Sequence, residues 1–176
     1  MLMGKRIALR SMVTEDAWLL YRWFNDQRIT ADLGARAPII GASIEEIAAK
    51  VQEALSSETE LHLIIVTLAE GKSIGVVSLF EMDMRNGTAE LRAIIGEPSL
   101  WDQGYGREAV AILLDHGFNV LNLHRVHLKA AEYNHRAIAC FRSCGFEREG
   151  TLREDHYHQG GHRSSVIMSA LRTERP

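Results

Sequence analysis

The chain has 176 residues, of which 46% are hydrophobic and 24% are charged, and its formal net charge is −3. This length suits about one domain with its own core, and this composition excludes disordered, collagen-like and coiled-coil chains. The net charge argues against a general nucleic-acid-binding protein, and no apolar run reaches the roughly 18 to 20 residues that cross a bilayer. We therefore expect one cytoplasmic domain over residues 1–176, with no nucleic-acid or membrane partner.

The first third of the chain predicts one strand and two helices. Residues 7–9 form a short apolar strand. Thr14 is placed to N-cap an amphipathic helix that ends near Asn25, and a capping-box pattern starts a second helix at Ser43. The apolar face of this second helix consists of Ile47, Val51, Ala54 and Leu55.

The middle of the chain predicts an antiparallel meander. Residues 61–68 and 73–80 are rich in β-branched side chains and flank a turn at residues 70–72, and Asn86-Gly87 forms the next tight turn. The strand that follows, residues 88–96, alternates between two faces. One face carries Glu90, Arg92 and Ile94, and the other carries Leu91, Ala93 and Ile95.

The last part of the chain predicts a parallel strand–helix–strand unit, a capped helix and a hairpin. A glycine-rich start at residues 104–106 opens a long helix, and residues 125–131 return as a parallel strand. Asn134 is placed as an N-cap and Gly145 as a C-terminal stop. The chain closes with strands 147–158 and 162–171, turning at Gly160-Gly161. The fold class is α/β, in the order β-α-α-β-β-β-α-β-α-β-β, around a mostly antiparallel sheet.

The start of the long helix is suited to binding an anion. Free backbone N–H groups and the positive end of the helix dipole meet there, which favours a pyrophosphate. Gly104 and Gly106 leave room for phosphate oxygens to approach the backbone, and Arg107 adds a positive charge. A simple strand-to-helix turn is the alternative interpretation.

Residues 101–109, Trp-Asp-Gln-Gly-Tyr-Gly-Arg-Glu-Ala, resemble the acyl-CoA pyrophosphate loop of the GNAT superfamily of N-acetyltransferases. Asn134-His135-Arg136-Ala137, followed by Phe141 and Gly145-Phe146, resembles the second signature of that family. Further short motifs between Leu9 and Arg153 resemble its RimJ/RimL branch. The resemblance covers nearly the whole chain.

This resemblance implies acetyl-CoA as the co-substrate. It implies that a bulge bends the strand at residues 88–96, that this strand separates from strand 125–131, and that pantetheine lies in the slot between them. The implied cofactor-binding residues are Ile94, Ile95, Gly96, Trp101, Asp102, Gln103, Gly104, Tyr105, Gly106, Arg107, Asn134, Ala137 and Phe141.

The implied reaction is direct attack of an amine on the thioester, which requires a proton acceptor. Glu90 matches an acidic position of the family and is our expected general base, while pairing with Arg92 or orienting the acceptor is the alternative role. The backbone N–H near Ile94 would stabilise the oxyanion. Phe141 occupies the position that often supplies a tyrosine acid, and it has no proton to give the leaving thiolate.

The amine acceptor remains open among a protein N-terminus, a polyamine, an aminoglycoside and an amino sugar, and the oligomeric state, including a homo-oligomer, is open too. In the resembling family the first two helices border the acceptor site, so aromatic and acidic side chains there are candidates, with core packing as the alternative for the rings. The expected substrate-contacting residues are Trp23, Asn25, Asp26, Glu81 and Asp83.

Other interpretations remain open. Residues 104–109 also fit the Gly-x-Gly-x-x-Ala pattern of dinucleotide-binding proteins, and Phe141 allows a catalytically silent acyl-CoA sensor. We expect no metal, since the geometry of His156, His158 and His162 depends on the turn between them. Cys140 and Cys144 are expected to pack as reduced thiols.

Overall fold

One mixed sheet runs through the part of the chain that the computed structural model describes, residues 1–34 and 42–174. Its strand order is β1-β2-β3-β4-β5-β6-β8-β7. Strands β5 and β6 are parallel, and every other neighbouring pair in this sheet is antiparallel. The strands are β1 (Leu2–Met3), β2 (Ile7–Ser11), β3 (Leu61–Thr67), β4 (Ser73–Asp83), β5 (Thr88–Ile95), β6 (Arg125–Ala131), β7 (Glu147–His158) and β8 (Gly161–Leu171).

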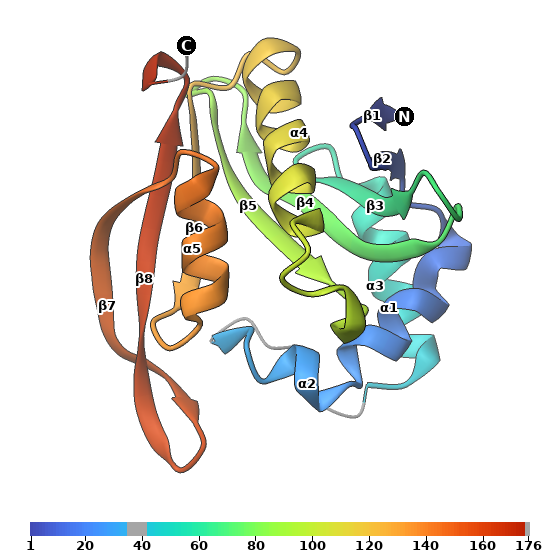
Figure 1. Ribbon diagram of the computed structural model, residues 1–176, viewed down its shortest axis with the longest axis horizontal. Coiled ribbons are helices and arrows are strands. Elements are labelled where there is room, and N and C mark those ends of the chain that lie inside the picture. Colours follow the sequence, from blue (N-terminus) through green and yellow to red (C-terminus); the bar gives the residue numbers. More distant parts are fainter. Residues whose placement is uncertain (35–41, 175–176) are drawn as a thin grey trace.

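Helices cover both faces of the sheet. In Figure 1, α4 crosses in front of β4 and β5 and α5 lies in front of β6, whereas α1 and α3 lie on the opposite face. The helices are α1 (Ala17–Phe24), α2 (Gln27–Thr30), α3 (Ile44–Ser56), α4 (Tyr105–Asn119) and α5 (His135–Ser143). Short 3₁₀ turns lie at Thr14–Asp16, Pro98–Leu100 and Arg172–Glu174.

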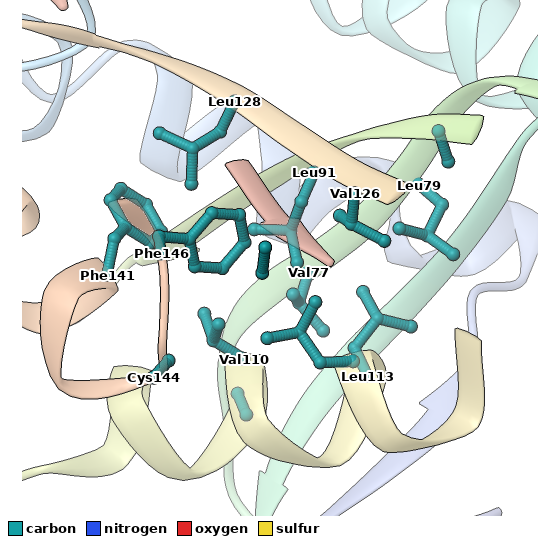
Figure 2. Packing of buried hydrophobic residues seen from close by; sticks show 14 of the residues in the cluster. Val77, Leu79, Leu91, Val110, Leu113, Val126, Leu128, Phe141, Cys144 and Phe146 are labelled. Carbon is teal, nitrogen blue, oxygen red and sulfur yellow. The ribbon is translucent and has the colours of Figure 1, made fainter. Parts of the chain in front are cut away.

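Two hydrophobic clusters hold these layers together. Figure 2 shows the larger one, in which Val110 and Leu113 of α4 meet side chains of β4, β5 and β6. At its α5 end, the rings of Phe141 and Phe146 meet edge to face at 5.7 Å between centroids. The smaller cluster packs α1 and α3 against β3 and β4 around the buried indole of Trp23. Helices therefore cover the sheet on both faces.

The local signals for helix ends are confirmed. Ser43 Oγ accepts from Glu46 N at 3.2 Å while Glu46 Oε2 accepts from Ser43 N at 2.9 Å, which is the predicted capping box. Asn134 Oδ1 accepts from Ala137 N at 3.0 Å and caps α5. Gly145 follows α5 with a φ of +91°.

Several sequence predictions need correction. Thr14 starts a 3₁₀ turn rather than capping a helix, and α1 begins three residues later. In this turn it is the Asp16 carboxylate that caps, since Oδ2 accepts a hydrogen bond from Val13 N at 2.8 Å. Leu55 is 40% exposed and lies off the apolar face of α3. Strand β1 and helix α2 are short elements that the sequence did not indicate. The last turn is centred on Gln159 and Gly160, both at positive φ, so β8 begins at Gly161.

The slot implied by the family resemblance is present, but its bulge lies on a different strand. β5 pairs with β6 over Thr88–Glu90 alone, after which β5 stays with β4 and β6 stays with β8. The register shift between β4 and β5 places one extra residue in β4, where Glu81 has a φ of +49°. The prediction of a bulge within residues 88–96 is therefore wrong, because the bulge lies in the neighbouring strand β4.

A partly buried polar cluster joins β6 to the part of β7 where the register shifts. Lys129 Nζ lies 2.5 Å from Asp155 Oδ2, and His156 Nδ1 lies 2.9 Å from Asp155 Oδ1. Burial alone would raise the pKa of the Asp155 carboxyl, but hydrogen bonds from Lys129, His156 and Ser165 lower this pKa from 3.8 to about 2. The folded state therefore favours the ionised carboxylate.

This pKa difference predicts a loss of stability in acid. The unfolded chain takes up the Asp155 proton first, so the stabilisation is complete above about pH 4 and disappears as the pH falls to about 2. We expect Asp155→Asn to lower the free energy of unfolding by at most about 2 kcal/mol at neutral pH, and by much less near pH 2. Urea unfolding at several pH values measures this. The same dependence on pH in Asp155→Asn and wild type would contradict it, and Asp115→Asn on the exposed side of α4 is the control.

Candidate active site

The N-terminus of α4 follows a glycine turn and opens into a cavity. Gly104 precedes the helix with a φ of +83°, a conformation that suits glycine. The first hydrogen bond of the helix runs from Glu108 N to Gly104 O at 3.0 Å, so the N–H groups of residues 105–107 precede the helical ladder. These residues line a cavity of about 470 Å³, here called the cofactor cavity.

Contacts from the bend between β1 and β2 hold this loop in place. Arg6 Nη2 donates to Gln103 O at 2.8 Å, and the Arg6 guanidinium lies 4.4 Å from the centroid of the Tyr105 ring. Glu108 Oε1 accepts from the backbone N of Lys5 and of Arg6, at 2.6 and 2.8 Å. Burial raises the pKa of Glu108, but hydrogen bonds from residues 5–7 lower it overall. No local pattern in the sequence links residues about 100 positions apart, so this support was not predicted.

Most of the predicted cofactor-binding residues lie together in the wall of the cofactor cavity. They come from β5, the loop after it, the start of α4 and the start of α5. Those in the wall are Ile94, Ile95, Trp101, Asp102, Gly104, Tyr105, Gly106, Arg107, Asn134, Ala137 and Phe141. Gly96 and Gln103 are absent from this wall. Gly96 lies against the Trp23 indole, and the Gln103 amide donates to Ser99 O at 2.8 Å.

Side chains from both sides close one end of the cofactor cavity. Trp101 Nε1 donates to Ile95 O at 2.8 Å, and the Arg136 guanidinium lies 3.8 Å from the centroid of the Trp101 ring. Arg136 also pairs with Asp32 at 2.9 Å, and Asn134 Nδ2 donates to Asp32 O at 3.0 Å. These contacts connect α5 with the loop before α4 and with the segment after α2.

A second cavity, of about 580 Å³, opens on the α3 face of the sheet and is here called the acceptor cavity. The two cavities share wall residues from the segment after α2, from β5 and from α5. The shared residues are Asp32, Leu33, Ala93, Ile94, Asn134, Ala137 and Phe141. The cavities therefore meet where β5 has separated from β6.

Glu90 lies beside this junction rather than in either cavity wall. It is the last residue of β5 that pairs with β6, and it is 3% exposed. Its Oε1 accepts from Arg92 Nε at 2.7 Å, so the predicted alternative of pairing with Arg92 is observed. Arg92 lines the acceptor cavity, and its guanidinium lies 3.9 Å from the centroid of the Phe80 ring. Burial lowers the pKa of Arg92.

The structure does not bring the predicted substrate-contacting residues into the acceptor cavity. Trp23 is 1% exposed, and a Cβ at Gly96 would lie 2.2 Å from its ring, so the prediction that this indole meets substrate is corrected to core packing. The Asn25 amide donates to Tyr21 O at 3.0 Å, and Asp26 caps α2 while pairing with Arg28. Neither cavity wall includes any of these side chains.

The two acidic candidates after β4 also lie outside both walls. Glu81 is the bulge residue of β4. Asp83 Oδ1 accepts from the backbone N of Arg85 and of Asn86, at 2.9 and 3.0 Å, and this stabilises the turn into β5. Their observed roles are therefore in the local backbone, and a substrate role for either remains a prediction.

Neither Phe141 nor the two cysteines provides an obvious acid. Phe141 lines both cavities while packing on Phe146. Cys140 and Cys144 lie at the end of α5 and are not joined in a disulfide. Hydrogen bonding with Cys144 and then burial raise the pKa of Cys140, which keeps its thiol protonated and poorly reactive.

The histidines of the last hairpin make structural contacts. The two-residue turn pairs His162 with Tyr157 instead of placing it beside His156 and His158. The His158 ring stacks on Tyr133 at 4.5 Å between centroids. Within residues 1–34 and 42–174, no three His, Cys, Asp or Glu side chains gather as a metal site. The same part of the chain contains no helix long and apolar enough to cross a membrane.

Comparison with known proteins identifies the class. The family model for the acetyltransferase (GNAT) domain matches residues 6–147. The N-acetyltransferase p20 of Bacillus licheniformis, whose function is uncharacterized, is 29% identical over 171 residues, covering 97% of this chain and 95% of that protein. The spermidine N(1)-acetyltransferase of Vibrio cholerae is 32% identical over 110 residues, covering 62% of this chain and 63% of that enzyme.

Solved structures show the same fold. The spermidine N-acetyltransferase from Vibrio cholerae in complex with CoA and spermine superposes with a TM-score of 0.88 at 24% identity, covering 97% of this chain and 98% of that one. The chain belongs to the GNAT acetyltransferase family. It is an N-acetyltransferase that uses acetyl-CoA to acetylate an amine. The single parallel strand pair and this family match decide against the dinucleotide-binding alternative.

Proposed function

We propose that acetyl-CoA binds with its pyrophosphate on the N–H groups of residues 103–107 and its pantetheine arm between β5 and β6. The observation that carries this proposal is the junction of the two cavities at the point where β5 leaves β6. Backbone groups of β5 beyond Glu90 are not paired with β6, so an extended pantetheine arm can form hydrogen bonds with them. Asn134 and Ala137 form the wall of the cavity on the α5 side of the arm.

The proposed pyrophosphate site is tested by a carboxylate at Gly106. A Cβ at Gly106 meets its nearest neighbour, Ile95 Cγ1, at 3.6 Å, so the fold has room for a side chain there. An acidic residue in the first turn also favours the helix. We expect Gly106→Asp to fold normally but to weaken acetyl-CoA binding at least tenfold in calorimetric titration, because its charge repels the pyrophosphate.

Gly106→Ala is the matched control for this test, since it adds the Cβ without the charge. It should bind acetyl-CoA within a few fold of wild type. Wild-type affinity in Gly106→Asp would show that the pyrophosphate lies elsewhere.

The acceptor is a small primary amine that enters through the acceptor cavity. A volume of about 580 Å³ suits a small ligand, and the wall carries the carboxylates Asp32, Glu53 and Glu60 beside the cations Lys50, Arg92 and Lys129. The spermidine acetyltransferases among the relatives make a polyamine the first acceptor to test, and a protein N-terminus is the alternative. Motif order supports the RimJ/RimL branch, and the free thiols support a reducing cytoplasm.

The amine then attacks the thioester carbonyl directly. The N–C bond forms, the C–S bond breaks, and the proton that the adduct loses from nitrogen goes to the departing thiolate. A backbone N–H near Ile94 is placed to bind the oxyanion at the cavity junction. Glu90 lies beside the junction and supports this step by holding the guanidinium of Arg92 at the acceptor cavity. Its role as the general base remains a prediction.

Glu90→Gln tests the contribution of this carboxylate. The substitution keeps the shape of the side chain but removes the charge that faces Arg92. We expect kcat to fall at least tenfold while the Kd of acetyl-CoA stays within about twofold, because Glu90 lies outside the cofactor cavity. Steady-state kinetics with spermidine and calorimetric titration measure the two quantities. A wild-type kcat would contradict a role for Glu90, and Glu147→Gln on the exposed start of β7 is the control.

The alternative of a catalytically silent acyl-CoA sensor, which Phe141 left open, is disfavoured by the family match. The two candidates differ in one measurement. An enzyme releases CoA when a panel of primary amines is added with acetyl-CoA, whereas a sensor binds acetyl-CoA and releases none.

A further inference from the structure

Three hydrogen-bonded polar side chains lie in the wall of the acceptor cavity. His62 of β3 has both ring nitrogens engaged, Nε2 with Glu60 Oε2 at 2.8 Å and Nδ1 with Ser78 Oγ at 2.9 Å. All three residues line the acceptor cavity, and Glu90 does not. This connected set, Glu60–His62–Ser78, was not found from the sequence.

The partners determine which nitrogen of His62 carries the proton. An ionised carboxylate only accepts hydrogen bonds, so the neutral imidazole donates from Nε2 to Glu60. Nδ1 is then an acceptor, and the Ser78 hydroxyl donates to it. The lone pairs of Ser78 Oγ remain able to accept a hydrogen bond. Ser78 therefore offers the acceptor cavity an oxygen that is backed by a base.

The position of this set matches the path of an incoming amine. Ser78 pairs in register with Arg92 on β5, two residues before Ile94, which lies at the cavity junction. The His62 ring is held edge-on to Phe80 at 5.0 Å between centroids. The His62 side chain is 9% exposed and that of Glu60 is 29% exposed, so the set runs from the buried floor of the cavity toward solvent.

Charged groups surround this set on every side. Glu60 lies at the start of β3, and Arg92 with Glu90 lies across β4 on β5. Glu81 of β4 interacts electrostatically with Arg92, as does Glu60. Lys50 and Glu53 approach from α3, and Lys129 approaches from β6. The Glu90 carboxylate offsets the charge of Arg92, and the carboxylates of Glu53 and Glu60 attract an ammonium to this cavity, so the acceptor needs a group that takes its proton.

We propose that Ser78, His62 and Glu60 form the proton relay that converts the bound ammonium into the attacking amine. This inference rests on the proposed function and deepens it. The ammonium gives one proton to Ser78 Oγ as Ser78 passes its own to His62 Nδ1. His62 becomes an imidazolium whose Nε2 proton stays hydrogen-bonded to Glu60, and after the acetylated product leaves it returns the Nδ1 proton to solvent through Ser78. The neutral amine then attacks the thioester, and its next proton ends on the CoA thiolate.

In this scheme Ser78 is a catalytic residue, since it touches the acceptor, while His62 and Glu60 are positioning residues that act through it. Imidazole suits this task because it exchanges protons readily between pH 5 and 8. Glu90 keeps a separate task, which is to hold Arg92.

The test is the pH dependence of kcat with spermidine and saturating acetyl-CoA. Ser78→Ala and His62→Gln should each lower kcat roughly a hundredfold at pH 7 with an unchanged KM for acetyl-CoA. The deficit should shrink as the pH approaches about 10, where an alkylamine loses its proton without help. Ser78→Thr keeps the hydroxyl and should retain most of the activity.

Ser169→Ala is the matched control. It removes another buried hydroxyl, one that donates to Glu149 at 2.7 Å on β8 outside both cavities, and it should keep wild-type kcat at every pH. The relay is overturned if Ser78→Ala stays within about twofold of wild type at pH 7, or if its deficit is the same at every pH.

Failure of the proposed acceptor can be separated from failure of the relay. A wild-type protein that releases no CoA with spermidine or the amine panel contradicts the proposed function. Nitrogen-15 NMR of the histidine rings tests the relay without turnover, because the relay requires the proton of neutral His62 on Nε2. A neutral His62 that carries its proton on Nδ1 overturns the relay, and Ser78→Ala should shift the Nδ1 resonance.

Discussion

The separation of β5 from β6 after Glu90 and His127 is the constraint on which the rest of the structure depends. Two parallel strands that stop pairing leave backbone donors and acceptors that a protein interior normally satisfies. Each strand is held apart by its other neighbour, because β5 remains paired with β4 as far as Ile95 and β6 remains paired with β8 as far as Ala131. The gap is therefore built into the sheet.

Close contacts at the end of β5 keep this geometry in place. A Cβ at Gly75 would lie 2.2 Å from Ile94 O, so only glycine lets β4 approach β5 here. A Cβ at Gly96 would likewise lie 2.2 Å from the ring of the buried Trp23. On the opposite face, α4 packs on β4 and β5 through the larger cluster shown in Figure 2. The position of the gap is thus set by core packing on both sides of the sheet.

The gap brings two kinds of chemistry to one place. The start of α4 presents backbone N–H groups at the end of the cofactor cavity, supported from behind by Arg6 and Glu108. The α3 face of the sheet presents carboxylates, cations and a histidine in the acceptor cavity. Because the cavities share Ala93 and Ile94, a thioester in the first can meet an amine in the second.

The sequence predicted what local patterns encode. The cap residues Ser43 and Asn134, the stop at Gly145 and the glycine-rich start of α4 each act through neighbours within a few residues, and each is observed. The predicted alternation of β5 is also observed, since Ile94 packs in the smaller cluster and Leu91 in the larger one on the opposite face.

What the sequence could not predict depends on contacts between distant segments. The bulge at Glu81, the support of the α4 loop by Arg6 and the burial of Trp23 under Gly96 all arise from tertiary packing. The pairing of His62 with Ser78 depends on the exact register of a hairpin whose strands and turn were predicted but whose register was not. The sequence offered the pairing of Glu90 with Arg92 as an alternative, but the burial of the Glu90 side chain became visible only in the structure.

A crystal structure of the protein with bound CoA would test the central claim most directly. We predict that the pantetheine arm lies between β5 and β6 beside residues 93–95, with the pyrophosphate on the N–H groups at the start of α4. The strands should stay apart with no change of register. CoA bound elsewhere, or β5 and β6 paired beyond Glu90 and His127, would contradict the account.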